Sequence, residues 1–162
     1  MNLNGLIYRL PKELKLLLAA FIIVLSIGFF TGLLFVKDTS SANPAGIEEQ
    51  YLGNEFDEDA SIMKFRKSEK EMLTLVHNHV LSMALIFFLL GLILSITKLN
   101  KRLKLFLMIE PFVSVLLTFG GIYLLWKGLP WMKFIVMFSG TLMTLSFAVS
   151  VCIILIQLLR KN

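Results

Sequence analysis

The chain has 162 residues, of which 57% are hydrophobic and 17% are charged, and its mean hydropathy is +0.80. These values lie far outside the range of soluble globular domains. The net charge of +5 does not indicate nucleic-acid binding, because the basic residues gather at the chain ends and between two apolar segments. The segment from 37 to 73 instead holds nine acidic residues against five basic ones.

Four segments exceed the roughly 18 apolar residues that mark a membrane-spanning helix. They cover about residues 14–36, 73–97, 103–126 and 132–159. We therefore predict one all-α membrane domain over residues 1–162, a four-helix transmembrane bundle. The basic residues flank the ends that must lie on one side of the membrane, which is the positive-inside pattern. Both termini are thus predicted to be cytoplasmic, and the long acidic loop of residues 37–72 to be extracytoplasmic.

The N-terminal part is predicted to be an interfacial arm followed by a membrane anchor. Apolar residues recur at helical spacing in the arm until Pro11 interrupts it. The apolar run of segment 14–36 is longer than the 7–15 residues or so of a cleaved signal peptide, so it is expected to be retained. Gly28 and Gly32 form a small-xxx-small pattern, which permits close helix packing.

The acidic loop divides into two parts. Lys37–Gly46 is rich in turn-forming residues and is predicted to be a polar connector. Residues 47–59 mix acidic with apolar and aromatic side chains, which indicates a segment that docks against another surface. Ser68 and Glu71 have the spacing of a capping box, so a helix is predicted to start there and to continue into the second span.

The only two histidines, His77 and His79, lie near the outer end of this second span. An ionisable side chain at the bilayer centre costs on the order of 3 kcal/mol, so a functional role is the default hypothesis. Residues two apart on a helix point about 200° apart, so the pair cannot easily bind one ion together. Small residues share the His77 face, which predicts that His77 faces the bundle and that His79 faces a cofactor or a second subunit.

Several interpretations of the histidines remain open. One of them could ligate haem, with Met83 or a residue from another subunit as the second ligand. One could serve a quinol site or a proton relay, because Glu71 shares the His79 face. One could ligate a metal together with Met72, Met83 or a loop carboxylate. These residues do not make up a complete ligand set, so no residue is assigned as a metal ligand. In the structural interpretation, both only bond to the backbone or to acidic loop residues.

Glu110 is the one carboxylate inside an apolar segment, and Pro111 beside it is expected to kink or loosen the helix. Its structural interpretation is a side chain that reaches the cytoplasmic headgroups or pairs with Lys104 or Arg102. Its functional interpretation is a proton carrier. Cys152 is the single cysteine and is expected to pack inside the bundle. Hydroxyl residues of the fourth span are expected to bond to neighbouring helices; they are Ser139, Thr141, Thr144, Ser146 and Ser150.

The run GIEEQYLGNE at residues 46–55, followed by Lys67-Ser68 and His77-Asn78-His79, resembles a group of small bacterial inner-membrane proteins. The resemblance covers about residues 46–97 and implies a four-helix protein of the bacterial inner membrane, without an established activity.

Together with the histidine pair, these features predict an accessory subunit of a bacterial respiratory or redox complex, in contact with the bilayer and with other subunits or a second copy. Haem or quinone would contact His77, His79 and Met83, and Glu71 and Glu110 are proton-relay candidates. The alternative is a structural or assembly protein whose outer loop docks a partner and which holds no cofactor. The sequence has no Gly-rich phosphate loop, Ser/His/Asp set or cysteine pair, so catalysis by this chain alone is not expected.

Overall fold

The computed structural model describes residues 3–40, 43–57 and 62–160, and every regular element in these ranges is helical. The elements are the 3-10 turn η1 (Leu6–Arg9), α1 (Lys12–Ser40), α2 (Pro44–Leu52), α3 (Glu69–Ser95), α4 (Lys101–Trp126) and α5 (Met132–Leu159). Helices α1, α3, α4 and α5 are long and apolar enough to cross a membrane. The prediction of an all-α protein with four spanning helices is therefore confirmed.

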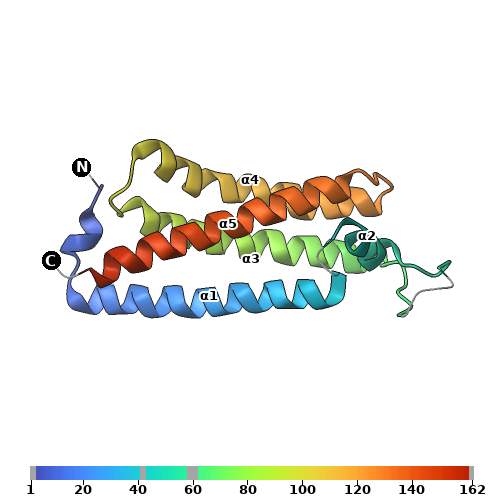
Figure 1. The fold of residues 1–162 in the computed structure, drawn as a ribbon, viewed down its shortest axis with the longest axis horizontal. Coiled ribbons are helices and arrows are strands. Elements are labelled where there is room, and N and C mark those ends of the chain that lie inside the picture. Colours follow the sequence, from blue (N-terminus) through green and yellow to red (C-terminus); the bar gives the residue numbers. More distant parts are fainter. Residues whose placement is uncertain (1–2, 41–42, 58–61, 161–162) are drawn as a thin grey trace.

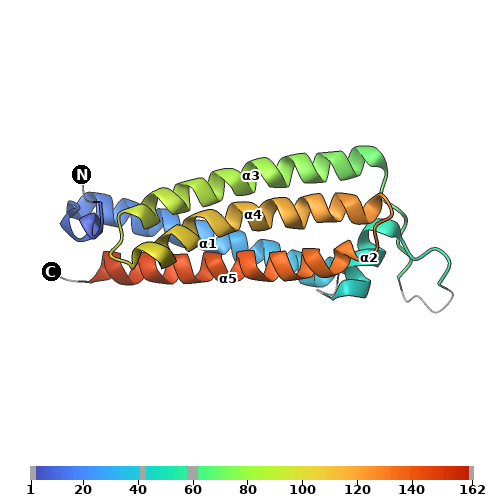
Figure 2. The same cartoon turned by 90° about the horizontal axis from the view of Figure 1, so that it is seen from above.

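The four long helices lie along one common axis, with α2 at one end of the bundle and both termini at the other (Figures 1 and 2). We call these two ends the α2 end and the terminal end. Helix α4 packs most extensively against α5, and next against α3. Helix α1 packs on α5 and α2 and leaves most of its surface exposed. The close-packed unit is therefore α3–α4–α5, with α1 attached at its side.

An aromatic cluster connects three of the long helices. The rings of Phe29 from α1 and Phe147 from α5 stack with centroids 3.9 Å apart and planes 7° apart. Phe87 from α3 meets both rings edge-on, at 6.4 Å and 6.3 Å. Aromatic pairs contribute about 0.5–1.5 kcal/mol beyond the area that they bury. Because apolar burial does not drive association between helices in lipid, such packing contacts hold α1 to the bundle.

The predicted polar connector over Lys37–Gly46 is wrong at both of its ends. Helix α1 continues to Ser40, and α2 already begins at Pro44. The α2 start is capped by Asn43, whose side chain accepts a hydrogen bond of 2.8 Å from the Gly46 N–H. Asparagine at the cap and proline at the first helical position both favour a helix start. Local capping thus forms a helix from residues that, by composition, are typical of a loop.

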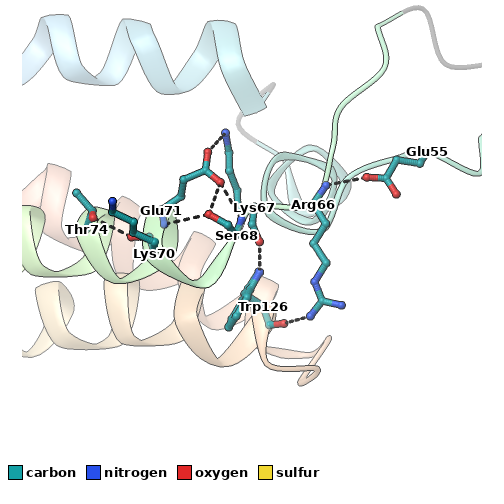
Figure 3. A network of polar contacts seen from close by, with 8 residues as sticks. All are labelled: Glu55, Arg66, Lys67, Ser68, Lys70, Glu71, Thr74 and Trp126. Carbon is teal, nitrogen blue, oxygen red and sulfur yellow. Dashed lines mark hydrogen bonds and ion pairs between the residues drawn. The ribbon is translucent and has the colours of Figure 1, made fainter.

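Residues 64–68, which we call the strap, fold back along α2 and tie it to the bundle. The Lys67 N–H donates to the Tyr51 carbonyl at 3.2 Å. The Trp126 indole donates to the Lys67 carbonyl at 2.8 Å, and the Arg66 guanidinium donates to the Trp126 carbonyl at 2.9 Å (Figure 3). An ion pair between Lys133 and Glu48 joins α5 to α2. The α2 end is therefore a folded cap.

At the terminal end, the N-terminal arm and α5 both bond to the α3–α4 turn. The N–H groups of Gly5 and Ile7 donate to the carbonyls of Thr97 and Ile96 at 3.3 Å and 3.1 Å. The Gln157 amide accepts from the Lys98 N–H at 2.7 Å and donates to the Lys98 carbonyl at 3.1 Å. This turn would otherwise leave backbone groups unpaired at the edge of the membrane.

Candidate functional site

Helix α3 begins with the predicted capping box. The Ser68 hydroxyl accepts a hydrogen bond of 3.3 Å from the Glu71 N–H, and the Glu71 carboxylate accepts from the Ser68 N–H at 2.8 Å (Figure 3). Lys67 lies 3.8 Å from the other carboxylate oxygen. A carboxylate in the first turn also complements the positive end of the helix dipole. Glu71 therefore fixes the start of the helix that carries both histidines.

His79 is held by its own helix and by α4. Its Nδ1 lies 2.9 Å from the Leu75 carbonyl, and its ring lies over Phe119 with centroids 4.7 Å apart. A carbonyl can only accept a hydrogen bond, so Nδ1 carries the proton in this contact. The other ring nitrogen, Nε2, has no hydrogen-bond partner among the described residues. This orientation resembles that of histidines that bind a metal through one nitrogen and donate a hydrogen bond through the other.

His77 does not face the bundle, so the prediction for its face is wrong. Its side chain is exposed, as are those of Thr74 and Leu81 on the same face. Larger apolar residues occupy the inward stripe of α3 instead; they are Met72, Val76, Val80, Met83, Phe87, Leu90 and Leu94. These larger side chains gain more packing contact inside the bundle than small residues would. They therefore determine which face of α3 points into the bundle.

A groove of about 370 Å³ runs along the α2 end of α3. It is lined by Lys70, Glu71, Thr74, Leu75, Asn78 and His79. All six residues belong to α3, so the groove is a shallow, open depression on one helix face, and a second surface would be needed to enclose a ligand there. Lys70 and Glu71 lie at one end of the groove, and the His79 imidazole lies at the other. The structure therefore brings Glu71 and His79 to one surface, as the sequence predicted, and leaves His77 outside the groove.

Met83 and Glu110 lie away from this groove. Met83 is half-buried and packs against the hydrophobic core one turn beyond His79. Glu110 lies on α4, nearer the terminal end. Gly91 of α3 lies next to Met108 of α4, and from this register Glu110 is about 25 Å along the axis from Glu71. The two proton-relay candidates are therefore too far apart for direct proton exchange.

Glu110 is buried between α4 and α5, with 8% of its surface exposed. One carboxyl oxygen accepts a hydrogen bond from the Ser114 hydroxyl, and the other accepts one from the Ser146 hydroxyl. Lys104, the expected ion-pair partner, instead donates to Asn4 and to the carbonyls of Ser95 and Thr97 at 2.6–2.9 Å. The structural interpretation of Glu110 as a headgroup-facing or ion-paired side chain is therefore wrong.

Glu110 belongs to a row of polar residues along the α4–α5 contact. Towards the α2 end, the hydroxyls of Thr118 and Ser139 lie 2.7 Å apart. Ser139 and Ser146 thus bond between helices as predicted, whereas Thr141 and Thr144 donate to carbonyls of their own helix. The sequence analysis did not single out Ser114 and Thr118. Glu110, Ser114 and Thr118 follow one another at intervals of four residues, which places all three on one helix face and could have identified them.

Within residues 3–40, 43–57 and 62–160, no group of three or more His, Cys, Asp or Glu side chains could hold a metal ion. Cys152 is exposed on α5 and does not pack inside the bundle as expected.

Comparison with known proteins places the chain in a family. Residues 41–162 match the model of the Aq_1264_TM family, which is described as a transmembrane helical domain. The match covers the α2 cap and helices α3, α4 and α5, which are also the most closely packed part of the bundle. No curated protein and no solved structure matches the chain. The chain is therefore an integral membrane protein and belongs to the Aq_1264_TM family of transmembrane helical domains.

Proposed function

We propose that this protein is an accessory subunit of a respiratory or redox complex in the bacterial inner membrane, and that His79 meets haem or a quinol there. The observation that carries the proposal is the orientation of the His79 imidazole. Nδ1 donates to the Leu75 carbonyl, and Nε2, which has no hydrogen-bond partner among the described residues, borders the open groove along α3. A single open ligand position is what a shared cofactor site requires.

In a neutral imidazole that carries its proton on Nδ1, Nε2 can only accept a bond. It can coordinate haem iron, or it can accept a hydrogen bond from the hydroxyl of a quinol. It cannot donate to the carbonyl of an oxidised quinone without first taking up a proton. Lys70, nine residues before His79, lies about 13 Å away along the helix, which suits an anionic group at the far edge of a ring system.

A complete haem site would need a second chain. Met83 lies on the same helix as His79 and packs against the core, so it cannot reach the opposite face of a haem bound at Nε2. His77 points to a different side of α3 and would contact a different partner or lipid. The proposal therefore places the second ligand on another subunit or a second copy. In the proposed topology the α2 end is extracytoplasmic and both termini are cytoplasmic.

The two histidines offer a matched pair of variants, because both are exposed on the same helix and only His79 borders the groove. The complex that co-purifies with the wild-type protein from native membranes is examined for a haem absorption band and for bound quinone. Binding of either ligand is expected in wild type and in His77→Ala, and its loss is expected in His79→Ala. If neither ligand binds, or if both variants behave alike, the proposal fails.

A second candidate, an assembly protein without a cofactor, is favoured by the loop that follows α2. Four large apolar side chains are exposed there: Phe56 (97%), Ile62 (67%), Met63 (61%) and Phe65 (68%). Asn54 holds the base of this loop together. Its side chain donates to the Ile62 carbonyl at 3.0 Å and accepts from the Lys64 N–H at 2.6 Å. A fixed stem that presents exposed apolar side chains is typical of a protein-docking surface.

A photo-reactive residue in place of Phe56 tests this second candidate in native membranes. Crosslinking to one defined protein, retained in His79→Ala and lost in Ile62→Asp, would favour an assembly role over cofactor binding. The same substitution in place of Phe30, an exposed residue of α1, provides the control for nonspecific contact with membrane proteins.

A further inference from the structure

The hydroxyl of Ser150 is an unpaired polar group in the bundle core. Ser150 is 1% exposed, and its Oγ has no hydrogen-bond partner among the described residues. Other hydroxyl residues of these helices donate to the carbonyl four residues earlier, as Ser26 does to Ile22 at 2.7 Å and Ser139 does to Ile135 at 2.8 Å. Ser150 makes no such bond, so its hydroxyl stays unpaired inside the bundle.

The register of α4 and α5 places Ser150 close to Glu110. Thr118 pairs with Ser139, and Glu110 pairs with Ser146, so the two helices run antiparallel. One turn along α5, from Ser146 to Ser150, therefore corresponds to one turn back along α4, from Glu110 towards Leu107. The hydroxyl of Ser150 thus lies one turn from the carboxyl group, towards the terminal end.

Pro111 leaves a backbone oxygen of α4 without its helical donor, three residues before Glu110. Proline has no N–H, so the carbonyl of Leu107 lacks the donor that a regular helix would supply four residues later. Pro111 is fully buried and Leu107 is 5% exposed, so this carbonyl lies inside the bundle. In membrane proteins, carbonyls released from helix bonding are typical ligands of small cations.

The buried carboxyl group also lacks a positive partner. Among the residues that the structure describes, no basic side chain lies within ion-pair distance of Glu110. A buried carboxyl group that stays ionised is normally paired or bound to a cation. The surrounding oxygens belong to the Ser114 and Ser146 hydroxyls, and Ser150 and Leu107 supply two more one turn away. Hard cations bind oxygen ligands of this kind.

We infer that Glu110, Ser146, Ser150 and the Leu107 carbonyl form a binding site for one small monovalent cation between α4 and α5. A single carboxylate neutralises a single positive charge, which favours a monovalent ion over a divalent one. The site is independent of the His79 groove, because it lies on different helices in the other half of the bundle.

Sodium ion is the probe that tests the inference. Thermal unfolding of the detergent-purified protein is measured in sodium chloride and in choline chloride at equal ionic strength, and radioactive sodium binding is measured directly. We expect one saturable sodium ion per chain and a melting temperature that rises with sodium concentration, because the ion binds only the folded state. An equal melting temperature in both salts and no saturable binding would overturn the inference.

Three variants and one control locate the site. Glu110→Gln is expected to abolish sodium binding, and Ser150→Ala to weaken it by about tenfold. Pro111→Ala returns an N–H donor to the Leu107 carbonyl, so it should also weaken sodium binding by about tenfold while making the helix more regular. Ser139→Ala is the control. Ser139 lies in the same row of polar residues but pairs with Thr118 and not with Glu110, so this variant should bind sodium like wild type.

Sodium binding that is unchanged in Glu110→Gln would refute the site. If Glu110→Gln does not fold, unchanged sodium affinity in both Ser150→Ala and Pro111→Ala would refute it instead.

Discussion

Gly53→Ala should release the strap from α2. Gly53 ends α2 with a φ of +81° and a ψ of 172°, a backbone conformation that is essentially restricted to glycine. A methyl group there would lie 2.7 Å from the backbone N of Arg66 and 2.8 Å from the carbonyl oxygen of Lys64. Both contacts are with backbone atoms, so no side-chain rotation relieves them. The strap itself must move.

The expected loss has two parts. An L-residue in this conformation costs about 1–3 kcal/mol. Moving the strap also weakens three hydrogen bonds: Lys67 N–H to Tyr51, Arg66 to Trp126, and Trp126 to Lys67. Each contributes about 0.5–1.5 kcal/mol, so the folded state should lose roughly 3 kcal/mol or more in total.

Gly128→Ala is the matched control. Gly128 has a φ of +107°, but an added methyl group would meet nothing within 4 Å. Gly128→Ala should therefore lose only the cost of the backbone strain, about 1–2 kcal/mol of unfolding free energy. Free energies of unfolding are measured in detergent, and trypsin cleavage after Lys64, Arg66 and Lys67 reports release of the strap. Equal destabilisation of the two variants, with no faster cleavage in Gly53→Ala, would refute the reasoning.

Four further outcomes are expected. Ser68→Ala removes the cap of α3 and should cost about 1 kcal/mol of unfolding free energy, measured by denaturant titration. Burial raises the pKa of the Tyr51 hydroxyl above its usual 10.0. The unfolded chain therefore releases this proton first, so stability should fall as pH rises above about 10, and Tyr51→Phe should flatten that slope in alkaline melting curves. Thr118→Val breaks the hydroxyl pair between α4 and α5 and should cost about 0.6–1.7 kcal/mol by the same titration. A cysteine at Asn54 should react with an impermeant thiol reagent added outside intact cells, and one at Asn100 should not; the reverse pattern would contradict the proposed orientation.

Local sequence determined the features that depend on neighbouring residues along the chain. The length and apolarity of the spans follow from the thickness of the bilayer. The start of α3 follows from the reciprocal hydrogen bonds between Ser68 and Glu71, which involve only one helical turn. The start of α2 depended on equally local capping by Asn43 and Pro44. Composition alone predicts a loop there, because these two capping residues make up only a small part of a polar segment.

Tertiary structure decided which helix faces are buried. Four spanning helices can turn about their axes with little change in their local bonds, so the neighbouring helices select the face. His77 lies outside because the bulky stripe that contains Phe87 packs inwards against Phe29 and Phe147. Glu110 is buried because the register of α5 places Ser146 opposite it. The sequence by itself determined the number, type and approximate ends of the spanning helices. Only contacts between helices decided the surroundings of each polar side chain, because those contacts join residues that are distant in the chain.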